Sequence, residues 1–102
     1  MVADLLDIAA PVTTADPPGG PFGSVVSVSL HCVDEGTGCL ATHFTLDGTE
    51  PTTASARYEV PILIEPPGTL RYFSVDGAGN VEASRWEEYV LDTVAPAVVE
   101  VD

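Results

Sequence analysis

Short stretches of this chain alternate regularly between apolar and polar residues. In the segment 26–32, valine, leucine and cysteine occupy the even positions, and serine and histidine occupy the odd ones. A period of two residues is that of a β-strand with one buried face. No stretch shows the 3.6-residue period of a helix, and Pro or Gly interrupts every window long enough to form one. The pattern therefore predicts an all-β fold.

Four further strands are expected where β-branched and aromatic residues gather between turn signals. They are 42–46, 62–64, 69–76 and about 84–91, the last carrying Trp86. Two weaker pieces, around 12–13 and 57–58, bring the total to about seven strands. Seven short strands in about 100 residues are typical of an antiparallel β-sandwich of the immunoglobulin or fibronectin type III kind. In 69–76 the alternation separates Leu70 and Tyr72 from Phe73, without showing which side is exposed.

The two ends of the chain carry similar segments. Leu6-Asp7-Ile8-Ala9-Ala10-Pro11 and Leu91-Asp92-Thr93-Val94-Ala95-Pro96 share Leu, Asp, Ala and Pro at an offset of 85 residues. Similarity at a fixed period is the signature of a tandem array, although a chain this rich in Ala and Val can also match itself by chance. We therefore expect 1–9 to be the tail of a preceding repeat or a linker. The sandwich domain would span 10–93, and 94–102 would be a linker or the start of the next repeat.

Charge and length narrow the classes of function. The 102 residues include 16 acids against 3 arginines, for a formal net charge of −13, yet 45% are hydrophobic. Such a chain can bury one core beneath an acidic surface. The charge argues against nucleic acid and anionic membrane surfaces as partners. No apolar run approaches the roughly 20 residues of a membrane span, and Met1 is not followed by the pattern of a signal peptide.

An ordered set of short motifs is similar to a known family. The motifs are Leu46-Asp47-Gly48-Thr49-Glu50-Pro51-Thr52, Tyr58, Pro61-Ile62, Thr69-Leu70-Arg71 and Asp76-Gly77-Ala78-Gly79-Asn80. Their order resembles the small immunoglobulin-like domain at the C-terminus of chitobiases and β-hexosaminidases, over roughly 13–92. The resemblance implies a non-catalytic module of a kind that recurs in tandem in bacterial secreted and surface proteins. It implies little about activity, because such modules are attached to many different proteins.

Cys32 and Cys39 are the only cysteines, and the loop between them contains two glycines that allow a sharp turn. In an extracellular module a lone pair of cysteines usually forms a disulfide, which we expect here. Free thiols and a zinc site with His31 and His43 are the alternatives. Cys-x6-Cys is not a zinc-knuckle spacing, however, and His31 points away from Cys32 on an alternating strand.

No combination of residues forms a catalytic pattern. The two histidines lack a nucleophile elbow or a catalytic cysteine signature nearby. Adjacent strand residues such as Glu87 and Glu88 face opposite sides of a sheet, so they cannot flank one glycosidic bond. We therefore expect neither an enzyme nor an organic cofactor.

Two glycine-containing segments are expected to be structured turns: Asp47-Gly48, and Asp76-Gly77-Ala78-Gly79-Asn80. Neither has the spacing of a phosphate loop or the acidic positions of an EF-hand. In the second, Gly77 or Gly79 would supply a positive φ angle, and the Asp76 and Asn80 side chains would cap loop amides.

Calcium has one candidate place, at the junctions between repeats. The acids there are Asp7, Asp16, Asp92 and Asp102. Oxygen ligands from two neighbouring domains suit Ca²⁺. The alternative is that these acids are simply solvated at the surface.

These features favour a structural repeat of a secreted or cell-surface bacterial protein, acting as a spacer, adhesion or filament-forming module beside neighbouring copies. The alternative is a carbohydrate-binding accessory module of a secreted glycoside hydrolase. Besides neighbouring copies, a polysaccharide or another surface protein is a further candidate partner. Sugar binding of that kind needs two or three exposed coplanar aromatic side chains. The chain has Trp86, three tyrosines and three phenylalanines, which is about the number of aromatic residues that pack in the core of a β-sandwich.

Overall fold

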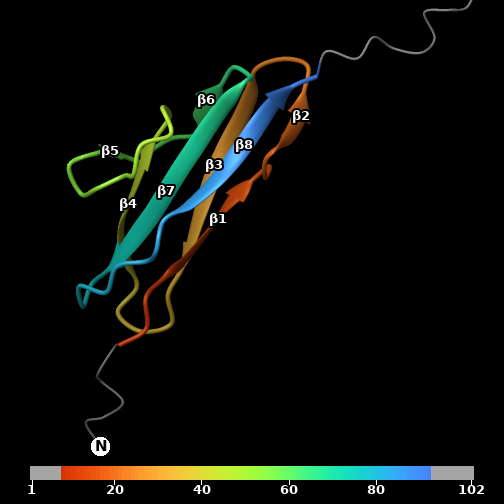
Figure 1. Ribbon diagram of the computed structural model, residues 1–102. Coiled ribbons are helices and arrows are strands. Elements are labelled where there is room, and N and C mark those ends of the chain that lie inside the picture. Colours follow the sequence, from red (N-terminus) through yellow and green to blue (C-terminus); the bar gives the residue numbers. More distant parts are fainter. Residues whose placement is uncertain (1–7, 93–102) are drawn as a thin grey trace, which may run out of the picture.

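The computed structural model describes residues 8–92, which form a two-layered β-sandwich (Figure 1). The strands β1-β3-β6 make one sheet and β2-β8-β7-β4-β5 make the other. This arrangement confirms the predicted all-β sandwich, and residues 8–92 contain no helix that could cross a membrane. The strands in chain order are β1 (Val12–Asp16), β2 (Gly20–Phe22), β3 (Val26–Val33), β4 (Cys39–Thr45), β5 (Ala56–Arg57), β6 (Ile62–Ile64), β7 (Gly68–Asp76) and β8 (Arg85–Leu91).

Strand β2 is the element that the sequence pattern does not predict. Its residues, Gly20-Pro21-Phe22, follow a Pro-Pro-Gly run, a composition typical of turns. In the structure β2 pairs with β8 in parallel register, whereas β1 pairs with β3 of the other sheet in antiparallel register. The start of the domain therefore crosses from one sheet to the other. As a result, the described residues contain eight strands rather than about seven, and one strand pair is parallel.

The core lies between the two sheets and follows the predicted alternation. In β3, Val26, Val28 and Leu30 are buried, and Ser27 and His31 are exposed. The cluster is completed by Ile62, Ile64, Leu70, Tyr72 and Tyr89.

Strand β7 is buried on both faces at its centre. Leu70 and Tyr72 face the core, while Phe73 on the opposite face is only 4% exposed. The ring of His43 stacks on Phe73 with 5.6 Å between centroids, and His43 Nδ1 lies 3.1 Å from the carbonyl oxygen of Ser55. His43 of the neighbouring strand β4 thus covers Phe73 on the outer face, and its ring is contacted in turn by the segment between β4 and β6.

Trp86 does not belong to the core, contrary to the expectation that packing consumes the aromatic residues. Its side chain is 59% exposed on β8, whereas Tyr89 is 1% exposed. Residues three apart on a strand face opposite sides of the sheet. The inward position of Tyr89 therefore places Trp86 outside.

The strands run along the long axis, so the described chain starts and ends at opposite poles (Figure 1). At the N-terminal pole, residues 8–11 lie beside the β3–β4 loop, 34–38. This loop is joined to the β7–β8 loop by a hydrogen bond from the Gly77 N–H to the Gly38 carbonyl. At the C-terminal pole, the end of β8 lies beside the β2–β3 loop, 23–25. There the Asp92 N–H donates to the Phe22 carbonyl at 2.9 Å.

Candidate functional site

The β3–β4 loop at the N-terminal pole is closed by a disulfide. Cys32 and Cys39 are joined with an S–S distance of 2.01 Å, and their Cα atoms are 6.3 Å apart. Gly38 adopts a φ angle of +88° and donates its N–H to the Asp34 carboxylate at 2.9 Å. The cysteines are bonded to each other, so they are not thiolate ligands for a metal.

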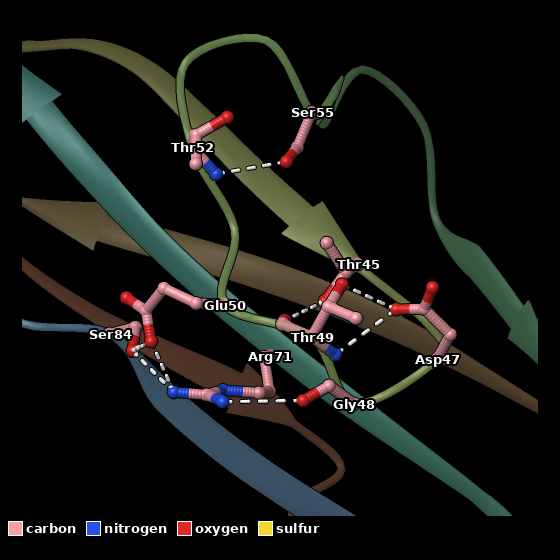
Figure 2. A network of polar contacts seen from close by, with 9 residues as sticks. All are labelled: Thr45, Asp47, Gly48, Thr49, Glu50, Thr52, Ser55, Arg71 and Ser84. Carbon is pink, nitrogen blue, oxygen red and sulfur yellow. Dashed lines mark hydrogen bonds and ion pairs between the residues drawn. The ribbon is translucent and has the colours of Figure 1, made fainter.

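The turn at Asp47-Gly48 is organised by the Asp47 carboxylate (Figure 2). Its Oδ1 atom accepts hydrogen bonds from the Thr49 hydroxyl at 2.6 Å and the Thr49 N–H at 3.1 Å. These bonds stabilise the ionised form and lower the pKa of Asp47. Gly48 has a φ angle of +85°, a conformation that glycine adopts without a steric penalty.

Arg71 on β7 ties this turn to two other segments (Figure 2). Its Nη1 donates to the Gly48 carbonyl at 3.2 Å, and its Nη2 donates to the Ser84 hydroxyl at 3.1 Å and to the Glu50 carboxylate. In the sequence, Arg71 stands out only as a motif residue on a predicted strand. Arg71 is one of 3 Lys or Arg residues in a strongly acidic chain, and this rarity is the feature of the sequence that could have indicated a structural role.

The second predicted turn, between β7 and β8, is organised by Asp76. This side chain is fully buried, and its Oδ1 atom accepts the N–H groups of Ala78 at 3.0 Å and Asn80 at 2.8 Å. The Asn80 side-chain amide donates to Asp76 Oδ2 at 2.9 Å. Gly79 carries the positive φ angle, +93°, whereas Gly77 lies against Thr37, where an added Cβ would be 3.2 Å from the Thr37 Cβ.

Glu82 is a buried carboxylate that the sequence does not predict, with 8% exposure. Its Oε1 atom accepts the N–H of Ser74 at 3.0 Å, and its Oε2 atom lies 3.5 Å from Nε of Arg85. The Ser74 hydroxyl in turn lies 2.6 Å from the Thr42 hydroxyl. No local pattern marks Glu82, because its partner Thr13 lies 69 residues away on β1.

The four aspartates predicted for calcium are not brought together within the described residues. Asp7 and Asp102 lie outside those residues. Asp16 ends β1 opposite Ser29, and Asp92 follows β8 at the C-terminal pole. Within 8–92 no group of three or more His, Cys, Asp or Glu side chains could hold a metal ion. A site between neighbouring copies therefore stays a prediction.

A hollow of about 330 Å³ adjoins Trp86, the only exposed aromatic side chain among residues 8–92. The Arg71 guanidinium carbon lies 5.3 Å from the centroid of the indole ring, in a cation–π contact. The hollow is lined by Gly48, Thr69, Arg71, Trp86 and Glu88.

The fold and these contacts define an immunoglobulin-like β-sandwich module whose polar motifs organise turns and hold loops to strands. Residues 17–85 match the family model of the chitobiase/β-hexosaminidase C-terminal domain. The chain belongs to this family. The match confirms the resemblance seen in the motifs. It identifies an accessory domain, and the comparisons found no catalytic domain in this chain. Neither the curated proteins nor the solved structures gave a match.

Proposed function

We propose that this domain is a structural repeat that spaces or presents parts of a secreted or cell-surface protein, with neighbouring copies as its main partners. The observation that carries the proposal is the placement of residues 8–11 and Asp92 at opposite poles (Figure 1). Because the chain enters the domain at one pole and leaves it at the other, each added copy lengthens the array by one domain. The 85-residue offset between the two similar end segments supports the same arrangement.

Two chemical properties suit this role outside the cell. A disulfide is stable in an oxidising compartment and rare in the cytosol. The net charge of −13 makes copies repel one another side by side, which keeps an array extended and prevents lateral association.

The test uses chains with two and three copies, in which Ile8 of each copy directly follows Asp92 of the preceding one. This junction preserves the 85-residue period. Small-angle X-ray scattering should show a maximum dimension that grows by equal steps from one copy to three. Copies that collapse side by side, with little growth in maximum dimension, would contradict the spacer function.

Carbohydrate binding is the second candidate, and the exposure of Trp86 beside a polar hollow favours it. An indole face can stack on the apolar face of a sugar ring, while Thr69 and Glu88 offer hydrogen-bonding groups. A single exposed aromatic side chain falls short of the flat platform of two or three that such modules use, so we rank this function second.

Trp86 is the sole tryptophan, which makes its fluorescence a direct probe of that site. Titration with soluble chitin or cellulose oligosaccharides should shift its emission if the hollow binds sugar. Retention of the protein on the insoluble polymer should then disappear in Trp86→Ala but persist in Tyr58→Phe. Unchanged emission together with no retention would eliminate this candidate.

A further inference from the structure

The N-terminal pole carries a small apolar hollow. Val12 and Val33 are paired across β1 and β3, and their side chains are 49% and 64% exposed. Apolar side chains left exposed together at one end of a domain mark a contact surface more often than isolated ones do. The hollow measures about 230 Å³ and is lined by Ala9, Ala10, Val12, Val33, Asp34 and Glu35.

The C-terminal pole also exposes aliphatic side chains. Leu91, the last residue of β8, is 42% exposed, and Val25 in the adjoining loop is 53% exposed. Leu91 pairs with Phe22, and the next residue of the chain donates its N–H to the Phe22 carbonyl, which keeps the two segments together. Both poles therefore expose aliphatic side chains on backbone segments that are held together by hydrogen bonds.

The repeat spacing limits the distance between these surfaces in an array. At an offset of 85 residues, the position equivalent to Val12 in the next copy is 97, so five residues separate it from Leu91. An extended chain spans at most ~3.6 Å per residue, so the two positions lie within roughly 22 Å of each other. Pro11 is buried at the pole, and its ring restricts φ, which further limits the directions the linker can take.

We propose that the Val12–Val33 hollow of one copy receives the Val25–Leu91 surface of the preceding copy, forming an apolar joint between repeats. This inference rests on the proposed tandem arrangement and adds the residues that stiffen it. Acidic side chains border both surfaces, with Asp34 and Glu35 on one and Asp92 on the other. Their repulsion opposes contact at low ionic strength and is screened by salt. The joint therefore tightens as salt is added, whereas an ion-paired joint would loosen.

The two-copy chain described above tests the joint. Its thermal midpoint should exceed that of the 102-residue chain by roughly 3 °C, and its interdomain distance distribution in scattering should narrow as NaCl rises. Val33→Asp in the second copy should remove the thermal gain and broaden that distribution. Val25→Asp in the first copy should do the same, and the two changes together should add little, because either alone opens one shared contact.

Leu63→Asp is the matched control, since Leu63 is a 69% exposed aliphatic side chain on β6 and gains the same charge. The 102-residue chain with Val33→Asp alone should keep its thermal midpoint, which separates loss of the joint from loss of folding. If Val33→Asp and Leu63→Asp affect the two-copy chain equally, the joint is wrong. An extended but flexible pair would overturn the joint and leave the spacer function standing, whereas a collapsed pair would overturn both.

Discussion

Glu82 binds Thr13 across 69 residues of sequence, accepting its backbone N–H at 2.8 Å and its hydroxyl at 2.6 Å. Thr13 lies on β1 of one sheet, while Ser74, which also donates its N–H to this carboxylate, lies on β7 of the other. All three side chains are buried. One carboxylate therefore fastens the first strand of the domain to the opposite sheet.

Replacing Glu82 by alanine should lower the free energy of unfolding by about 2–4 kcal/mol, because two buried N–H groups lose their acceptor. Urea unfolding would measure the loss, and faster amide exchange at Thr13 would locate it. Glu59 is exposed and serves as the control, since Glu59→Ala should stay within about 0.5 kcal/mol of the parent protein. Equal effects of the two substitutions would show that the buried carboxylate does not hold β1.

Reduction of the Cys32–Cys39 disulfide should destabilise the domain without unfolding the sheets. The chain-entropy model assigns a loop of this length about 2.5 kcal/mol, which corresponds to a fall in thermal midpoint of roughly 10 °C or more. The oxidised protein should also be about 2 Da lighter than the reduced form, because the bond forms with loss of two hydrogens. Two thiols that alkylate without reductant or denaturant would contradict the disulfide.

Tyr72 and Tyr89 should make the protein sensitive to alkali. Burial, followed by the negative charges of Glu87 and Asp16, raises the pKa of Tyr89 to about 12. Burial and the hydrogen bond to Glu87 raise the pKa of Tyr72 as well. Because both folded-state pKa values exceed the unfolded value near 10, stability is full below pH 10 and falls as the pH rises toward 12.

Urea midpoints measured between pH 8 and 12 would test this dependence, and Tyr89→Phe should flatten the decline. The tyrosinate absorbance of the folded protein should accordingly keep rising well above pH 10. A single ionisation step near pH 10 for all the tyrosines would count against it.

Arg71→Lys should cost about 1–2 kcal/mol although the charge is retained. A lysine ammonium cannot reach the Gly48 carbonyl, Glu50 and Ser84 with the geometry of a planar guanidinium. Amide exchange in the turn at Gly48 should quicken at the same time. Arg57→Lys, at an exposed position, should have little effect on either quantity, and similar losses for the two variants would argue against the network.

Divalent cations should stabilise the 102-residue chain weakly and without selectivity, since the described residues hold no cluster of three metal-binding side chains. The predicted site between copies is tested in the two-copy chain, whose junction retains Asp92 of the first copy, in the place of Asp7, together with Asp16 of the second copy. There, Ca²⁺ should raise the thermal midpoint beyond Mg²⁺ at equal ionic strength, because Ca²⁺ accepts flexible coordination by six to eight oxygens. Asp92→Asn in the first copy should abolish the difference. Identical responses to the two ions would end the calcium hypothesis.

Local patterns in the sequence determined most of the strands and turns of this domain. The alternation in 26–32 specifies β3 because a strand buries every second side chain. Asp47 and Asp76 identify their turns because a short carboxylate beside glycine can accept nearby backbone N–H groups. Each of these signals is complete within a few residues, so it can be recognised without knowing the rest of the fold.

Tertiary structure decided the features whose cause lies in distant partners. The turn-like segment Gly20-Pro21-Phe22 becomes a strand because the edge of β8 supplies hydrogen-bonding groups. Trp86 lies outside the core because Tyr89, three residues further along β8, faces inward. Glu82 is tolerated inside because Thr13 and Ser74 converge on it from two sheets. Long-range pairing selects among the conformations that a short segment permits, and this selection cannot be read from the segment alone.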